Sequence, residues 1–368
     1  MVTLLVIALV VVLLATAHVG YWRRRFFVEV EYEHEQILDT DDGCTIVLRR
    51  LPRPEGSVAA ASVPVLMVHG LAANHRNSDL VTDHSMARYL RAAGRDVWLV
   101  TLRSGHTMRT WRARARVRFD HMVEHDVPLA IREVLHRTGA SQVDYIGYSM
   151  GGMLAYATVA NADVCELVRR VVIIGSPPML RVPWLLRGVM KLAAWLPRAI
   201  VPTIHTRFFA ISFAVVSDLV FTPFHRLLAG DRSVIRRGLV PRAMVSVIAD
   251  IPGPLAADFC GWQAAHGGHV TYRNTPVLAL LPGAQMPALF IAGAIDPLGR
   301  VDGMRTAFES WGAAEKQFLV LGSAHGGRHD YSHADMILSQ HAPEEVFEPI
   351  ARFLLPASVR SSFMTTSD

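Results

Sequence analysis

The chain has 368 residues, of which 51% are hydrophobic, and a formal net charge of +5 at pH 7. Its basic residues are almost all arginines and no nucleic-acid-binding motif interrupts it, so we predict no nucleic-acid partner. The three cysteines, Cys44, Cys165 and Cys260, lie far apart and give no disulfide framework, which fits a reducing compartment. The length suits one globular domain that carries an insertion.

Residues 1–22 are predicted to form a transmembrane helix. Met1 to Gly20 contains no Lys, Arg, Asp or Glu, and about 20 apolar residues suffice to cross a bilayer. Residues 21–25 supply two interfacial aromatics and three arginines, which are typical of a membrane boundary. The alternative is a cleaved signal peptide, because residues 15–17 have the small-x-small form of a cleavage site. The missing basic residue at the start favours an uncleaved single-pass anchor, and the three arginines after it favour a cytoplasmic position for the rest of the chain under the positive-inside rule.

The apolar run from Val63 to Val68 is predicted to be a strand that is buried on both faces. It leads directly into His69-Gly70-Leu71. This short segment is therefore expected to lie at the carboxyl end of a central strand.

Residues 147–151, Gly-Tyr-Ser-Met-Gly, are the most informative stretch of the chain. A strand-like segment, 142–146, precedes them, and a helix-like segment, 152–160, follows. G-x-S-x-G on a sharp strand-to-helix turn is the nucleophile elbow of the α/β-hydrolase fold, where small residues permit a strained turn that exposes the serine hydroxyl. The pattern predicts an α/β fold with a mostly parallel sheet and with Ser149 as the nucleophile.

An enzyme of this kind needs two backbone N–H groups that stabilise an oxyanion. One belongs to the residue after the nucleophile, and the other belongs to the loop after an early strand. Met150 and Leu71 occupy these two places and are the predicted donors.

Between Ser176 and about Gln285 the alternation of buried strands and helices stops. Hydrolases insert a helical cap over the active site here, so we predict a cap at 176–285 between two parts of the core, 28–175 and 286–357, and a flexible tail at 358–368. An apolar segment that contains many arginines suits a lipid-like acyl chain or an anionic membrane surface. Packing of the cap onto the core accounts for most of the same apolar residues.

Asp296 follows the predicted strand Pro287–Gly293, at the strand end where ligands gather in open α/β sheets. We predict that Asp296 orients the catalytic histidine and stabilises its imidazolium form. Asp302 lies nearby, but its position is typical of the start of a helix.

The residues alone leave the histidine open. A place soon after the last core strand favours His325, whereas the end of a loop before an amphipathic helix favours His333. His325, His329 and His333 also have the i, i+4 spacing of metal ligands. Gly326-Gly327 disfavours the helix that such a site would need, and no zinc-spaced motif accompanies it, so we predict no metal and no cofactor.

Several segments make the chain resemble the acid-lipase branch of the α/β hydrolases, with its relatives among polyhydroxyalkanoate synthases and intracellular bacterial esterases. Residues 34–52 resemble the opening β-hairpin of acid lipases, and residues 94–99 are similar to their G-Y-D-V-W-L strand. Residues 331–346 are similar to their catalytic-histidine segment, N-H-L-D-F followed by A-P-E-x-V. This last match implies that His333, rather than His325, is the catalytic histidine.

The synthases have cysteine at the elbow, whereas this chain has Ser149, which favours acyl transfer to water over polymer synthesis. We therefore expect a membrane-anchored serine hydrolase that cleaves carboxylic esters, lipid-like ones above all, through a Ser149–Asp296–His333 triad and an acyl-enzyme. The alternatives are an acyltransferase or a polyhydroxyalkanoate-related enzyme on the same fold, and a non-catalytic protein that binds lipid or a protein partner.

Overall fold

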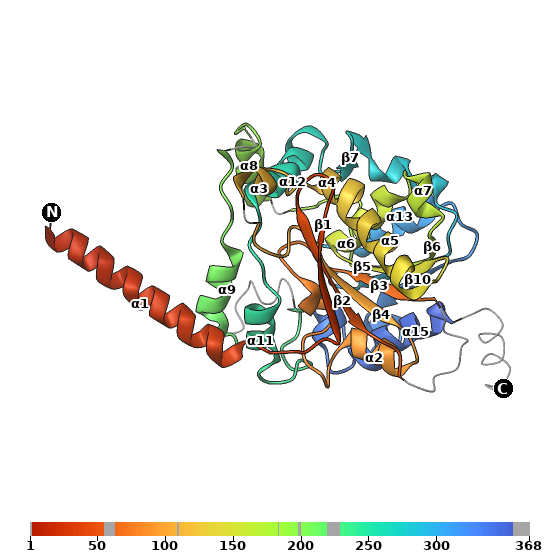
Figure 1. Ribbon diagram of the computed structural model, residues 1–368, viewed down its shortest axis with the longest axis horizontal. Coiled ribbons are helices and arrows are strands. Elements are labelled where there is room, and N and C mark those ends of the chain that lie inside the picture. The colour runs from red at the N-terminus through yellow and green to blue at the C-terminus, as the bar shows by residue number, and fades with distance from the viewer. Residues whose placement is uncertain are drawn as a thin grey trace.

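The computed structural model describes residues 2–54, 63–108, 110–182, 184–197, 200–218 and 229–355. The tail predicted at 358–368 lies outside these residues. The centre of the molecule is a mostly parallel eight-stranded sheet with helices on both faces, which is the predicted α/β-hydrolase fold (Figure 1).

The sheet has the strand order β1-β2-β4-β3-β5-β6-β9-β10. Its first two strands form an antiparallel hairpin, β2 also runs antiparallel to β4, and the remaining neighbours are parallel. The strands are β1 (His34–Asp39), β2 (Thr45–Leu51), β3 (Val65–Val68), β4 (Val97–Thr101), β5 (Val143–Tyr148), β6 (Val168–Ile174), β9 (Ala288–Gly293) and β10 (Lys316–Leu321). Because β3, β5, β6, β9 and β10 are parallel, their carboxyl ends lie at one edge of the sheet.

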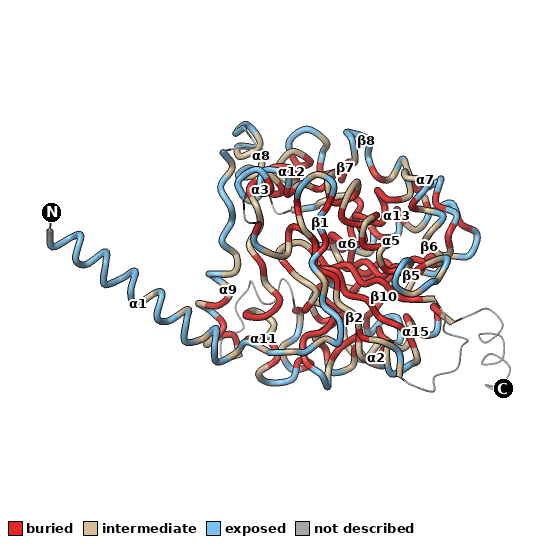
Figure 2. Tube along the Cα trace, viewed as in Figure 1, coloured by how far each residue is buried: buried red, intermediate tan, exposed pale blue. Residues whose placement is uncertain are grey.

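The central strands are buried along their whole length because helices cover both faces of the sheet (Figure 2). Leu66 and Val68 enter the apolar cluster on one face, and Val65 and Met67 enter the cluster on the other. The helices on the first face are α5 (Val127–Thr138), α6 (Met150–Thr158) and α13 (Val301–Ser310), and those on the second are α2 (Met86–Ala92) and α15 (Glu348–Leu354).

Shorter helical pieces complete the core. They are α3 (Trp111–Ala115), α4 (Phe119–His121), α7 (Ala162–Cys165) and α14 (Asp335–Leu338), with π-helical turns at Met122–Asp126 and Pro343–Phe347 and 3-10 turns at His75–Asn77, Val277–Ala279, Leu281–Gly283 and Ser323–His325. The helix that was expected to begin at Asp302 begins one residue earlier, at Val301.

A buried ionic cluster lies at the opposite end of β5 from Ser149. The Asp144 carboxylate is fully buried and contacts two guanidinium groups. Arg169 donates to it at 2.8 and 2.6 Å, and Arg95 donates to Asp144 Oδ2 as well. Both arginines also donate to the carbonyl of Leu354 at the end of α15. The cluster therefore connects β5, β6 and the segment before β4 to the last helix of the core.

The segment between β6 and β9 contains helices and a small hairpin in place of further core strands. Its helices are α8 (Trp184–Ala193), α9 (Thr206–Ala214), α11 (Leu239–Ser246) and α12 (Gly253–Ala265), and its hairpin joins β7 (Thr271–Tyr272) to β8 (Thr275–Pro276). These elements fall within the segment 176–285, where a helical cap was expected. Their role as a cap stays a prediction.

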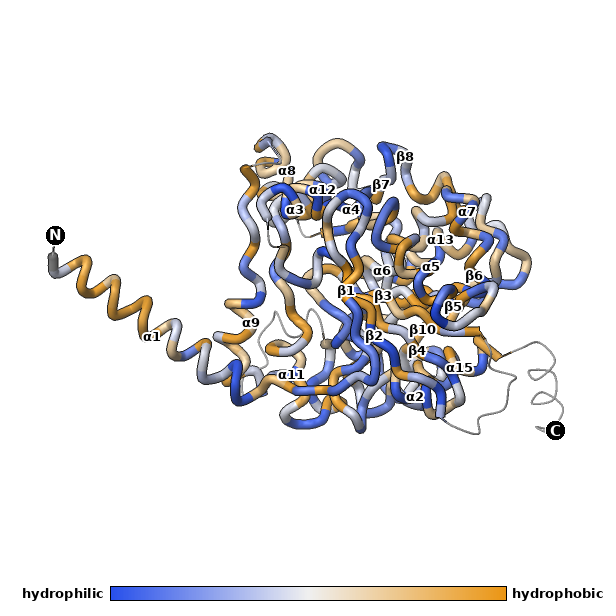
Figure 3. The backbone as a smooth tube through the Cα atoms, in the orientation of Figure 1, coloured by the Kyte–Doolittle hydropathy of each residue, from blue (hydrophilic) through white to orange (hydrophobic). Residues whose placement is uncertain are grey.

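Helix α1 (Val2–Phe26) projects from the globular body (Figure 1). The span Thr3–Phe26 is long and apolar enough to cross a membrane, and it extends four residues past the predicted end at residue 22. Figure 3 shows hydrophobic colouring in the part of this helix nearer the N-terminus and hydrophilic colouring where it meets the globular body. An N-terminal helix of this composition suits either a membrane anchor or a signal sequence.

Candidate active site

Ser149 occupies a strained turn between β5 and α6. Its backbone has φ +53° and ψ −118°, a conformation that residues with a side chain rarely adopt. A Cβ at Gly147 would lie 2.5 Å from the nitrogen of Gly152, and one at Gly151 would lie 2.2 Å from the carbonyl oxygen of Val68. Both glycines of the motif are therefore required by close backbone contacts, and the predicted strand, turn and helix are present.

Asp296 and His333 are joined by a hydrogen bond. His333 Nδ1 lies 2.7 Å from Asp296 Oδ2, and both residues are buried. The other carboxylate oxygen of Asp296 accepts the backbone N–H groups of Leu298 at 2.8 Å and Gly299 at 3.0 Å. Because a carboxylate accepts the Nδ1 proton, the neutral imidazole keeps its lone pair on Nε2. This is the tautomer that a general base requires.

His333 lies beside the end of the strand that leads to Ser149. The hydroxyl of Tyr148 donates to the carbonyl oxygen of His333 at 2.6 Å, and the two ring centroids are 5.0 Å apart. A Cβ at Gly175, just past β6, would lie 3.1 Å from both Asp296 Oδ2 and His333 Cε1. Residues from the carboxyl ends of β5, β6 and β9 and from the loop after β10 therefore meet at one place.

The other histidines after β10 do not share this arrangement. His325 is exposed in the turn Ser323–His325. His329 lies over the ring of Tyr331, with centroids 3.8 Å apart, and its centroid is 5.8 Å from that of His341. Within the described part of the chain, the histidine that contacts Asp296 is His333.

His69 fixes the loop after β3, a feature that the sequence analysis did not foresee. Burial lowers the pKa of His69 to about 4, so the ring is neutral at physiological pH. The N–H of Leu102 donates to its Nε2 at 3.0 Å, so Nδ1 carries the proton and donates to the carbonyl of Gly70 at 2.8 Å. The His-Gly pair directly after a buried strand is the only sequence signal for this bridge.

The same loop lies against the nucleophile. A Cβ at Gly70 would be 3.0 Å from Ser149 Cβ and 3.5 Å from its Oγ. Among the described residues, the N–H groups of Leu71 and Met150 donate no hydrogen bond to the backbone of a turn or loop. The adjacent Ala72 is held at φ +53°, and its carbonyl accepts the N–H of Ala249 at 2.9 Å. These two N–H groups are the candidate donors beside Ser149.

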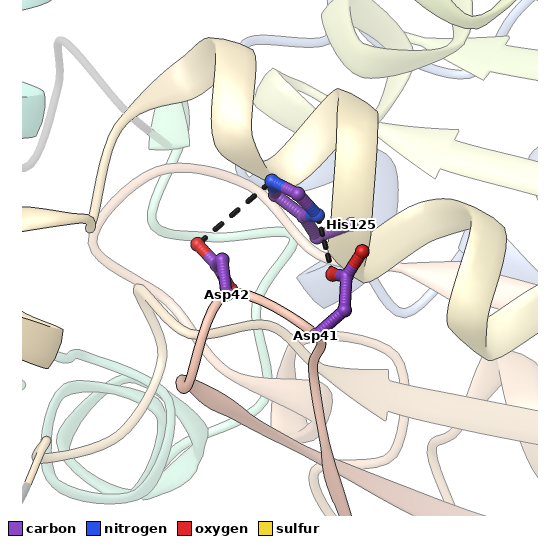
Figure 4. Close-up of side chains that lie close together, drawn as sticks. All are labelled: Asp41, Asp42 and His125. Atoms are coloured by element: carbon purple, nitrogen blue, oxygen red, sulfur yellow. Dashed lines mark ion pairs between the residues drawn. The ribbon is translucent and has the colours of Figure 1, made fainter.

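Asp41, Asp42 and His125 form a group whose ligand atoms lie within 4.8 Å of one another (Figure 4). His125 Nδ1 is 2.6 Å from Asp41 Oδ1. Both oxygens of Asp42 accept from the guanidinium of Arg103, at 2.6 and 3.0 Å. Although burial opposes it, hydrogen bonds from Arg103 and Thr40 hold the pKa of Asp42 at about 2. Since the arginine already supplies the positive charge, these residues form an ion-pair cluster that does not fit a resident cation.

Comparison with known proteins agrees with this fold. Residues 63–327 match the family model described as alpha/beta hydrolase fold, which is well over half of the chain. The chain belongs to the α/β-hydrolase fold family. The matched span contains Ser149 and Asp296 and ends before His333.

Among curated proteins, this α/β hydrolase is similar to lipases, as its sequence motifs indicated. It is 28% identical over 167 residues to lysosomal acid lipase/cholesteryl ester hydrolase of Homo sapiens, which covers 42% of this chain and 39% of that protein. It is 24% identical over 368 residues to lipase member M of Mus musculus, which covers 88% of this chain and 82% of that protein. The match to the first of these relatives thus spans about two-fifths of its length.

Solved structures share the fold at low identity. A soluble variant of monoglyceride lipase from Saccharomyces cerevisiae, in complex with a substrate analog, has a TM-score of 0.62 and 15% identity, covering 89% of this chain and 96% of that one. A thermophilic esterase from Thermogutta terrifontis has a TM-score of 0.57 and 17% identity, covering 87% and 98%. The predicted fold and the resemblance to lipases are confirmed.

Proposed function

We propose that the protein is a membrane-anchored serine hydrolase that cleaves carboxylic esters through Ser149, His333 and Asp296. The observation that carries the proposal is the 2.7 Å hydrogen bond between His333 Nδ1 and Asp296 Oδ2, beside the strained turn of Ser149. The similarity to proteins named as lipases supports an ester as the substrate. A protein that only bound lipid would not need this set of polar groups.

The first half of the reaction acylates the enzyme. Ser149 Oγ attacks the ester carbonyl while its proton passes to His333 Nε2, and Asp296 stabilises the resulting imidazolium. The N–H groups of Leu71 and Met150 stabilise the oxyanion, where the loss of one donor typically costs about 3 kcal/mol. The tetrahedral intermediate then expels the alcohol, which takes the proton from His333, and the acyl group stays on Ser149.

The second half releases the acid. A water molecule gives a proton to His333 Nε2 as its oxygen attacks the acyl-enzyme carbonyl. Collapse of the second tetrahedral intermediate returns the proton to Ser149 Oγ and frees the carboxylic acid. If an alcohol replaces water in this step, the same residues transfer the acyl group, so the water content of the site decides between hydrolysis and transfer.

A lipid-like substrate and an uncleaved anchor belong to the same proposal. The apolar span Thr3–Phe26 supports insertion into a membrane, and Arg23–Arg25 at its end support a cytoplasmic catalytic domain under the positive-inside rule. N-terminal sequencing of the purified protein tests the anchor, since an uncleaved chain keeps the residues of α1.

The catalytic proposal is tested with a fluorophosphonate probe, which labels an activated serine. The wild type is expected to be labelled and the Ser149→Ala variant is not. Ser310→Ala is the matched control, because Ser310 is a partly exposed serine whose hydroxyl donates to the carbonyl of Thr306 in its own helix. Turnover of p-nitrophenyl esters of graded chain length then defines the acyl group. Normal labelling and turnover by Ser149→Ala would contradict the assignment.

A further inference from the structure

Helix α9 has a buried face and an exposed aromatic face. Ile211 and Ala214 are buried, whereas Phe208, Phe209 and Phe213 are 44%, 56% and 56% exposed. With 100° between successive residues, Phe209 and Phe213 lie on the side opposite to the two buried residues, and Phe208 lies on the flank, about 60° from Ile211. We call these three residues the aromatic face. Exposed aromatic side chains that cluster in one patch often mark a binding surface, whereas single exposed apolar residues are common on any protein.

The buried side of α9 packs on the end of α1. Ile211 and Ala214 belong to one apolar cluster with Val19, Trp22 and Phe26 of α1. His18 Nε2 also lies 3.1 Å from the carbonyl oxygen of Ser212. Helix α9 therefore lies beside the last turns of α1, at the level where the apolar run of α1 ends, and its aromatic face points away from α1.

Positive charge surrounds this junction. Arg23, Arg24 and Arg25 are exposed in the last turn of α1. Arg207 on α9 lies near this group, since burial lowers its pKa and the charge of Arg23 lowers it further, while the charge of Asp250 opposes the shift. A hollow of about 350 Å³ is lined by Gly20, Arg23, Arg24 and Phe27. A hollow lined by two arginines and a phenylalanine has the chemistry that receives a phosphate headgroup.

Exposed apolar residues also lie at the end of α8, which precedes α9 in the chain. Leu192, at the end of α8, and Trp195, just after it, are 75% and 87% exposed. Both helices lie on the side of the molecule towards which α1 projects (Figures 1 and 3). A membrane that α1 crosses would therefore meet this side of the globular body first.

We propose that the aromatic face of α9 and the arginines at the end of α1 dock on the surface of an anionic phospholipid bilayer, the one that α1 enters. Phenylalanines then insert among the lipid headgroups while the arginines bind the phosphates. Two contacts, one through α1 and one through α9, fix the orientation of the catalytic domain and hold α8 and α9 at the lipid surface. This inference rests on the membrane anchoring proposed above for α1.

Depth-dependent quenching in the full-length protein tests the docking. An environment-sensitive fluorophore is attached at Phe213→Cys, at Ile37→Cys and at Leu13→Cys, each in a Cys165→Ser/Cys260→Ser background. The protein is reconstituted in phosphatidylcholine vesicles with nitroxide lipids, with and without phosphatidylglycerol. Ile37 is the matched control, because it is an exposed apolar residue on β1, away from α1. Leu13 reports insertion of α1.

The label at 213 is expected to be quenched severalfold more than the label at 37, most strongly by headgroup nitroxides. Phosphatidylglycerol should strengthen that quenching, and added salt should weaken it, because ionic screening reduces the attraction of the arginines.

Equal quenching at 213 and 37, with strong quenching at 13, would show an anchored but undocked protein and overturn the inference. A blue-shifted label at 213 that nitroxide lipids do not quench would indicate a second copy or a protein partner and would also overturn it. No quenching at 13, 37 and 213 would reject both docking and anchoring.

These outcomes are separate from the catalytic proposal. Fluorophosphonate labelling of Ser149 in the same vesicles reports the catalytic residues whatever the position of α9. If the protein is labelled at Ser149 but undocked, the docking inference is rejected and the esterase assignment stands. If the protein is docked but not labelled at Ser149, the docking inference stands and the esterase assignment is rejected.

Discussion

The hydroxyl of Tyr148 donates a 2.6 Å hydrogen bond to the backbone carbonyl of His333. Tyr148 directly precedes Ser149, so this bond connects the turn of the proposed nucleophile to the loop of the proposed base. Both residues are buried, and burial together with the negative charges of Asp296 and Asp335 raises the pKa of Tyr148, which keeps its hydroxyl protonated. Tyr148 is therefore a positioning residue.

Replacing Tyr148 with Phe should lower kcat/KM for a short ester by about tenfold, because the variant leaves a buried carbonyl without a donor at a cost of roughly 1–2 kcal/mol. Rates of fluorophosphonate labelling measure the same loss without a product-release step. Tyr156→Phe is the matched control, since its hydroxyl donates to the buried carbonyl of Ser176 at 2.8 Å and does not contact His333. Equal losses in the two variants would argue that only stability is affected.

Two histidine variants separate the candidates after β10. His333→Ala should lose activity by several orders of magnitude, as triad knockouts do, whereas His325→Ala should change it by less than about tenfold. The physical reason is that His333 is bonded to Asp296 while His325 is exposed. Steady-state hydrolysis of p-nitrophenyl butyrate distinguishes them. The opposite ranking would move the base to His325.

Much of this site was predictable because its signals are local. The G-x-S-x-G turn lies between a strand and a helix that periodicity reveals, and Asp296 follows a strand whose residues are all apolar. The buried strands could be recognised from their own residues, because a strand whose two faces both contact helices is a nearly continuous hydrophobic run.

The long-range contacts could not be predicted in the same way. His325 and His333 follow the same strand, and only the path of the intervening loop, which turns at Gly326 with φ +85°, brings the second to Asp296. The roles of His69 as a bridge between Gly70 and Leu102, and of Tyr148, depend on contacts between segments far apart in the chain. The spacing of apolar residues indicates which side chains are buried, but it does not indicate which distant residues they contact.

Asp335 should make the stability of the protein depend on pH. Its side chain is fully buried, Oδ2 accepts the N–H of Ser332 at 3.1 Å, and backbone hydrogen bonds from Ser332 and Asp231 only partly offset the effect of burial on its pKa. Burial raises its pKa to about 7, above the unfolded value of about 3.9. Between these two values the folded state binds a proton that the unfolded state has lost, so the contribution of Asp335 to stability falls as the pH rises towards about 7.

The Asp335→Asn variant removes that titration, because the amide is neutral at every pH. Its stability relative to the wild type should therefore increase with pH between about pH 4 and 7, by at most about 1.4 kcal/mol per pH unit, and level off above this window. Thermal unfolding of both proteins across that range measures the difference. Melting curves that shift in parallel, with a constant difference in Tm, would contradict the raised pKa.

The ionic cluster around Asp144 should matter for stability and not for chemistry. Asp144→Ala leaves the buried guanidinium of Arg95, and that of Arg169, without their carboxylate, and breaking a buried pair in this way typically costs about 3–5 kcal/mol. Asp83→Ala is the matched control, since it breaks an exposed pair with Arg236 that is worth about 0–1 kcal/mol. Thermal scanning in detergent should show a fall in Tm of about 5–10 °C for the first variant and about 2 °C or less for the second.

At low temperature both variants should still be labelled by a fluorophosphonate, because Asp144 lies at the amino end of β5 and Ser149 follows its carboxyl end. Loss of labelling by a folded Asp144→Ala variant would show instead that this cluster affects the geometry of the active site.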